Sequence, residues 1–218
     1  MNPERFRIGI DGEWSLEDWY VFPRTIDQTY SFLYSITEVG RLEGEPEEDE
    51  PLYITYTAHP WRGGYSAVNF YNYLHDLVPK PLRPRVISIH YASPGWLELG
   101  LAIGVALSIR RIVKAFCDSG REIVSFYNDI YDGLNERKLQ RISVKREELR
   151  LTREQIEFAE YSMKKLSKMM AFDGLTELKQ ITPNELSSLK ILLSFFRRIR
   201  VLGDYQKNGK ADFGAKEP

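Results

Sequence analysis

The stretch from Arg85 to Ile109, RVISIHYASPGWLELGLAIGVALSI, decides how the chain is expected to fold. Its first part is rich in β-branched residues and predicts a strand over about 85–91. The run Ala92-Ser93-Pro94-Gly95 then breaks the strand. Ser93 suits a helix N-cap and Pro94 suits the first helical position, whose N–H has no partner. The sequence therefore predicts a helix from Gly95 onward, with the apolar segment Trp96–Ile109 as its buried start.

Small residues recur every four positions in this segment, at Gly100, Gly104 and Ser108. On a helix they share one face, where another backbone could approach closely. An apolar run of this length is typical of a buried core helix, which is our main expectation. A role at a membrane surface is the alternative, because Arg110 and Arg111 follow the run.

Further helices are predicted downstream. Asp118-Ser119-Gly120 ends the first, Thr152 with Gln155 forms a capping box, and Thr182 with Glu185 forms another. Three of these helices carry apolar seams with heptad-like spacing, at Ile123, Tyr127, Ile130 and Leu134, at Ile156, Met163, Leu166 and Met170, and at Leu189, Leu193 and Phe196. Such seams predict an antiparallel bundle core; the alternative is that one seam contacts a second copy or a protein partner.

Upstream of Arg85, alternating residues predict strands over about 5–11 and 52–58, and helices are expected over about 26–39 and 66–78. The fold class is therefore α+β, with a small three-stranded sheet, its covering helices and a following antiparallel helical bundle. We expect an acidic, aromatic-rich part over 1–92, a bundle over 93–202 and a flexible tail over 203–218. Together these parts form one compact unit.

Charge divides the 218-residue chain unevenly, although the net charge is only -1. Residues 1–83 hold 7 basic and 14 acidic residues, and residues 84–218 hold 23 and 17, so the parts carry -7 and +6. The single cysteine, Cys117, excludes an intrachain disulfide. With no signal peptide pattern at the start and no apolar run long enough to span a bilayer, we expect a cytoplasmic protein.

No nucleotide, catalytic or metal motif is present, and no cofactor or metal is predicted. His59, His75 and His90 lack metal-ligand spacing, and Cys117 is expected to be a buried structural thiol. The turn Ser93-Pro94-Gly95 is expected to cap a helix rather than bind an anion. A basic cluster could meet nucleic acid, although glutamates interleave with it. Its members are Arg137, Lys138, Arg141, Lys145 and Arg146.

A resemblance begins at Tyr91-Ala92-Ser93-Pro94-Gly95. A strand, an aromatic-x-Ser-Pro-Gly turn, an apolar helix and then charged helices are similar to a group of uncharacterised bacterial proteins, over about residues 85–170. The resemblance implies a bacterial cytoplasmic or membrane-peripheral protein, and it implies no activity for any residue.

Three hypotheses for function follow. The leading one is a non-enzymatic interaction or assembly module that binds itself or a protein partner through a helical seam, with the acidic aromatic part as a second contact surface. The others are a membrane-peripheral effector using the Trp96–Ile109 helix, and a nucleic-acid-associated protein or an enzyme of unrecognised type.

Overall fold

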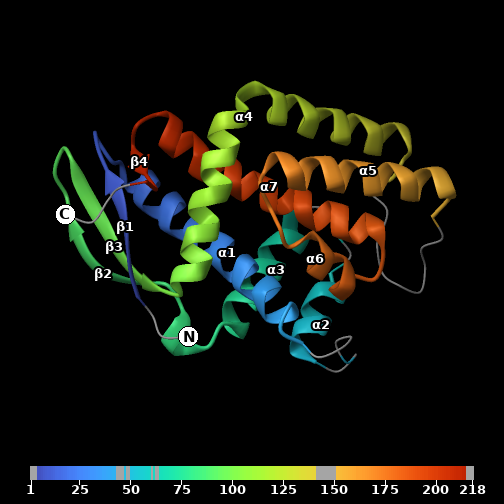
Figure 1. The fold of residues 1–218 in the computed structure, drawn as a ribbon, viewed down its shortest axis with the longest axis horizontal. Coiled ribbons are helices and arrows are strands. Elements are labelled where there is room, and N and C mark those ends of the chain that lie inside the picture. Colours follow the sequence, from blue (N-terminus) through green and yellow to red (C-terminus); the bar gives the residue numbers. More distant parts are fainter. Residues whose placement is uncertain are drawn as a thin grey trace.

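The computed structural model describes residues 4–42, 47, 50–59, 61, 64–140 and 151–214. A small sheet lies at one end of the molecule and the helices pack beside it and extend away from it (Figure 1). This arrangement confirms the α+β class expected from the sequence.

The sheet contains β1 (Glu4–Ile10), β2 (Arg85–His90), β3 (Gly95–Leu101) and β4 (Ala211–Asp212), in the order β2-β3-β1-β4. All neighbours are antiparallel. The inner face of the two central strands is apolar and buried, with Phe6, Ile8 and Ile10 on β1 and Leu97, Leu99 and Leu101 on β3. The predicted strands at 5–11 and 85–91 are therefore present.

The predicted start of the long helix is wrong, because residues 95–101 form the strand β3. The segment alternates between an inner set, Leu97, Leu99 and Leu101, and an outer set, Trp96, Glu98 and Gly100. Two of the three outer residues are apolar or lack a side chain, so the period of two was hidden in what looked like one continuous apolar run. β3 pairs with β1 on one side and β2 on the other, which is why it is buried.

The Ser93-Pro94-Gly95 turn consequently joins two strands, not a strand and a helix. A Cβ atom on Gly95 would lie 2.3 Å from the carbonyl oxygen of His90 and 2.7 Å from the backbone nitrogen of Ala92. The turn therefore needs glycine because the backbone folds back on itself there.

Helix α1 (Leu16–Val39) begins at an N-cap Ser15, whose hydroxyl accepts a hydrogen bond from the Asp18 amide, and it packs against α3, α4 and α7. This helix starts ten residues earlier than the sequence predicted and contains Pro23. Thr25, just before the predicted start, lies inside the helix, where its hydroxyl donates to the Val21 carbonyl at 2.7 Å.

The predicted strand over 52–58 is wrong, because Pro51–Thr57 form the helix α2. All of residues 52–57 are apolar, aromatic or β-branched, so alternation could not be distinguished from a helical face. The threonines satisfy their hydroxyls inside the helix: Thr55 donates to the Pro51 carbonyl at 2.8 Å and Thr57 to the Tyr53 carbonyl at 2.9 Å. α2 packs on α3 (Gly64–Leu77), which the sequence predicted, and a short 3-10 turn, η1 (Lys80–Leu82), leads to β2.

The C-terminal half is a helical bundle of α4 (Ile103–Glu136), α5 (Arg153–Met169), α6 (Leu175–Ile181) and α7 (Glu185–Lys207). α4 turns sharply at Gly120 (φ 55°, ψ -125°), which is where the sequence predicted a helix end (Figure 1). α7 lies at the centre and is buried on every side from Leu186 to Phe196. The Thr152–Gln155 capping box is confirmed, whereas α7 is capped by Asn184 rather than Thr182.

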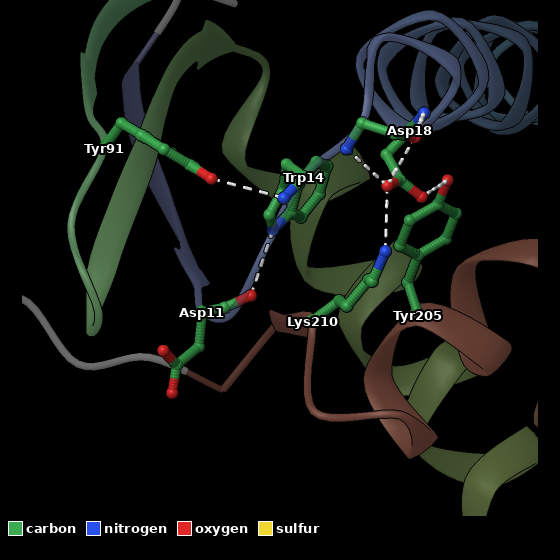
Figure 2. Close-up of polar contacts among 7 residues, drawn as sticks. Asp11, Trp14, Asp18, Tyr91, Tyr205 and Lys210 are labelled. Carbon is green, nitrogen blue, oxygen red and sulfur yellow. Dashed lines mark hydrogen bonds and ion pairs between the residues drawn. The ribbon is translucent and has the colours of Figure 1, made fainter.

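The flexible tail expected over 203–218 is corrected as far as the structure describes it, to residue 214. α7 continues to Lys207, and β4 then pairs with β1 through Ala211 and Asp212. Phe213 is 1% exposed. Figure 2 shows how this segment is held: Lys210 Nζ contacts an Asp18 carboxylate oxygen at 2.8 Å, and the Tyr205 hydroxyl donates to the other oxygen at 2.9 Å.

Candidate interaction surface

Strand β2 lies at one end of the described sheet and is exposed along its length. Val86 is 54% exposed and Ile89 is 49% exposed, although both lie on the inner, apolar face. Their cross-strand neighbours on β3, Leu99 and Leu97, are buried. The helices therefore cover the inner face only as far as β3, and β2 extends beyond this cover with apolar side chains.

A shallow apolar groove separates β2 from α1. A cavity of about 80 Å³ is lined by Pro23 and Ile26 from α1, by Pro84 and Val86, and by the inner face of β3. The register of β2 shifts between Val86 and Ser88, which places Ile87 on the outer face near Gly100. β2 thus has an irregular backbone at its centre, with Val86 and Ile89 on the same side of the sheet.

The exposed apolar surface continues onto the start of α1. Tyr91 follows β2 directly and is 58% exposed, and its ring meets the Trp19 ring edge-on with centroids 6.3 Å apart. Its hydroxyl accepts a hydrogen bond from the Trp14 backbone amide at 3.2 Å, as Figure 2 shows. Leu16 and Tyr20, one turn apart on α1, are 89% and 62% exposed. We call Leu16, Tyr20, Val86, Ile89 and Tyr91 the apolar strip.

The outer face of the sheet is different, because its polar groups satisfy one another. Glu98 is 7% exposed and its carboxylate contacts Arg7 at 3.5 Å, Arg5 at 3.6 Å and the Ser88 hydroxyl at 3.1 Å. The Trp96 ring lies between the His90 ring, stacked at 4.2 Å, and the Arg7 guanidinium at 4.9 Å. Ile87, which is 41% exposed, is the large exposed apolar side chain on this face.

The distribution of exposed apolar side chains is uneven along the described chain. Nine of eleven large ones lie at or before Tyr91. They are Leu16, Tyr20, Ile54, Val68, Tyr73, Val86, Ile87, Ile89 and Tyr91; the other two are Leu107 and Tyr161.

The seam residues named from the sequence lie inside the bundle instead. Met163, Leu166 and Met170 are at most 1% exposed, Leu189, Leu193 and Phe196 are at most 2% exposed, and Ile156 is half-buried. α5 packs on α7 within the same chain. These side chains are the chain's own core, so in this fold they are not available as a contact surface for a partner.

Ser93, Pro94 and Gly95, which were expected at a junction between a strand and a helix, form the turn and the start of β3 in the β2–β3 hairpin. The Ser93 hydroxyl donates to the Asp11 carboxylate, and this bond and the Gly12 amide lower the pKa of Asp11. The Arg85 side chain covers Gly100, whereas Gly104 is exposed with no atom within 4 Å of its added Cβ. The stripe of small residues expected on one helix face is therefore wrong.

The expected basic patch is only partly described. Arg137 is engaged within the chain: it pairs with Glu154 at 3.2 Å, lies 4.3 Å from the Phe158 ring and donates to the Gly133 carbonyl at 3.2 Å. Lys138 ends the same helix with a positive φ of 56°. Arg141, Lys145 and Arg146 lie outside the described residues.

The histidines and the cysteine have separate environments. His59 lies among the rings of Trp61, Phe70 and Tyr73, whereas His90 stacks on Trp96. Burial raises the pKa of the Cys117 thiol, which lies 3.7 Å from the Gly203 carbonyl oxygen. A thiol held neutral in this way is a poor nucleophile.

Comparison of the chain with protein-family models, with curated proteins and with solved structures finds no match. None of the helices in the described part of the chain combines the length and the apolar character needed to cross a membrane.

Proposed function

We propose that the protein is an assembly module that pairs with a second copy of itself through the β2 edge. The observation that carries this proposal is the exposure of Val86 and Ile89 on the inner face of an edge strand. Apolar side chains on an unpaired edge normally favour pairing with another strand. The proposal retains the interaction role expected from the sequence and moves its surface from the helical seams to the sheet.

The arrangement of β2 is self-complementary. With a two-fold axis between Ile87 and Ser88, antiparallel pairing sets Val86 of one copy opposite Ile89 of the other, on the same inner face. This gives two apolar cross-strand pairs, each of a kind that stabilises sheets by about 0.2 to 1 kcal/mol.

Pairing of the strands alone would bury too little surface for a stable dimer, which needs roughly 1,200 Å² or more. The remainder of the apolar strip supplies the additional area. Leu16 and Tyr20 are exposed near Trp19, whose ring contacts Tyr91 at the end of β2, and tyrosine is one of the residue types enriched at interfaces. We therefore expect these side chains to become buried together with Val86 and Ile89.

Analytical ultracentrifugation of the full chain tests the proposal. We expect the wild-type protein to sediment at twice the mass of its 25.4 kDa chain at micromolar concentrations. The double variant Val86→Lys/Ile89→Lys is expected to be a monomer, because it places charges in the paired edge. Both side chains are already about half exposed, so the variant is expected to fold, and its far-UV circular dichroism spectrum should match that of the wild type.

Leu107→Lys is the matched control. Leu107 lies on α4 away from the strip and is 50% exposed, close to the 49% of Ile89. This variant should sediment as the wild type does. A wild-type chain that stays monomeric up to near-millimolar concentration, or a double variant that still dimerises, contradicts the proposal.

The membrane-peripheral alternative required an apolar helix over Trp96–Ile109. The first part of this segment, Trp96–Leu101, belongs instead to a central strand of the sheet. Within the described part of the basic cluster, Arg137 is already paired with Glu154.

A further inference from the structure

A cavity lies where the C-terminal ends of α1 and α3 meet the N-terminal end of α2. Its volume is about 370 Å³, which is within the range of small-molecule sites. Much of its wall is apolar and comes from α2 and α3, through Pro51, Leu52, Leu74 and Leu77. Leu74 is fully buried, and Leu52 and Leu77 are half-buried. The wall can therefore contact the hydrocarbon part of a ligand.

The two charged residues of this lining are both acidic. Glu38, on α1, pairs with Arg41 one turn further along the helix, at 2.5 Å, and its side chain is 37% exposed. Glu50 is the N-cap residue of α2, but its side chain forms no cap hydrogen bond. Among the described residues, no basic side chain pairs with Glu50. A cavity with an apolar wall and two carboxylates is complementary to a ligand that carries a positive charge.

Tyr34 supplies a third acceptor to the same lining. It is only 6% exposed, yet its hydroxyl forms no hydrogen bond with a described residue. Buried hydroxyls normally have a partner, so this one points to a ligand. Burial and the negative charge of Glu38 raise the pKa of Tyr34, so the hydroxyl is neutral at physiological pH and its oxygen can accept a hydrogen bond.

The remaining polar residue of the lining, Ser35, already has partners. Its hydroxyl donates to the Phe32 carbonyl at 2.7 Å and lies 2.7 Å from the Tyr56 hydroxyl, in a contact that joins α1 to α2. The groups left to meet a ligand are therefore acceptors, namely the carboxylates of Glu38 and Glu50 and the Tyr34 hydroxyl oxygen.

We propose that this cavity binds a small primary amine with a hydrocarbon chain, in its ammonium form. A primary ammonium has three N–H donors and no acceptor, which matches a lining that offers two carboxylates and one hydroxyl oxygen. The hydrocarbon chain covers the leucines of the wall, which a bare inorganic cation would leave in contact with water. The proposal does not depend on pairing of the β2 edge, because no residue of the apolar strip lines this cavity.

Isothermal titration calorimetry of the full chain with hexylammonium chloride is the test. Hexylammonium is expected to bind the wild-type protein and to raise its Tm relative to sodium chloride at matched ionic strength. Hexanol has the same chain without the charge, and hexanoate has the opposite charge, so both are expected to bind more weakly by about tenfold or more. Trimethylhexylammonium keeps the positive charge but has no N–H, and it should also bind more weakly than hexylammonium.

Two variants locate the site. Glu50→Gln should weaken hexylammonium binding by about tenfold or more, because it removes a charged acceptor, and Tyr34→Phe should weaken it by about threefold or more, because it removes a neutral one. Neither should change the binding of hexanol. Both variants are expected to fold, since Glu50 is partly exposed and the Tyr34 hydroxyl has no hydrogen bond within the described chain.

Glu157→Gln is the matched control, since Glu157 is 62% exposed on α5 and pairs with Arg153 one turn away. Its affinity for hexylammonium should equal that of the wild type. Failure of hexylammonium to bind the wild-type chain at tens of millimolar, or equal weakening by all three substitutions, overturns the site. Hexanol or hexanoate that binds as tightly as hexylammonium overturns the choice of a cation. Tighter binding of acetyl-lysine amide, which carries an ammonium chain on a peptide unit, overturns the choice of a free amine.

Discussion

At the scale of single residues, Asp18 has the most consequential contacts of any described side chain. It caps α1 through Ser15, pairs with Lys210 and accepts from Tyr205, so it joins the first helix to the end of the chain (Figure 2). The ammonium group of Lys210 is the largest cause that lowers the pKa of Asp18. Nothing local in the sequence indicated Lys210 as its partner, because the two residues are 192 positions apart.

We predict that Asp18→Asn lowers the free energy of unfolding by about 1 to 2 kcal/mol at neutral pH, because it removes a charged cap and ion-pair partner. The pKa of Asp18 is lower in the folded state, so its stabilisation is complete above the ordinary carboxyl value of 3.8 and is lost as pH falls below it. Urea unfolding between neutral and acidic pH should therefore show the two proteins converging at low pH.

Asp129→Asn, an exposed position in α4, is the control for this experiment. A constant difference between Asp18→Asn and wild type down to the lowest pH studied would contradict the assigned role of the charge.

At the scale of elements, the contact between α4 and α7 depends on a glycine. A Cβ atom on Gly203 would lie 2.2 Å from Cδ1 of the Phe116 ring, so the helices approach here because Gly203 has no side chain. We predict that Gly203→Ala destabilises the protein by about 1 to 3 kcal/mol through overpacking. Chemical denaturation measures this effect.

Gly104→Ala provides the contrast, because its added Cβ meets nothing within 4 Å in the first turn of α4. It should leave stability unchanged or raise it by about 1 kcal/mol at most, since alanine is the better helix former. Equal destabilisation by the two substitutions would show that the close approach is not the cause.

Some end signals placed elements correctly from the sequence, whereas the Ser93-Pro94 signal, which predicted a helix start, did not. The Thr152–Gln155 box and the break at Gly120 were placed correctly because caps and glycines act locally. β3 and α2 were misassigned because their apolar residues fit both periods. Tertiary contacts decided the structure of both segments. β3 has strands on both sides, and α2 packs against α3.

At the scale of the whole molecule, the C-terminal segment completes the sheet rather than extending from it. Phe213 is buried and its ring packs near Phe22 of α1, with centroids 5.9 Å apart. We predict that Phe213→Ala lowers the free energy of unfolding by about 3 to 5 kcal/mol, the usual cost of deleting a buried aromatic ring. A flexible tail would instead give a change near zero in the same denaturation experiment.

The candidate surfaces were harder to predict than the fold class. The apolar strip combines α1 with β2, so it exists only after distant segments meet. The seams at Met163 and Leu189 predicted a bundle core, with contact to a partner as the alternative, because a seam has the same pattern in both cases. Both residues lie in the chain's own core.

The pairing of β1 with β3 has a consequence for biosynthesis. Arg7 and its partner Glu98 are separated by 91 residues, which a ribosome adds in roughly 5 to 20 seconds at ordinary elongation rates. Throughout that interval the nascent β1 carries Phe6, Ile8 and Ile10 with no strand beside it. Emerging chains of this protein should therefore be clients of ribosome-associated chaperones until the hairpin has left the exit tunnel.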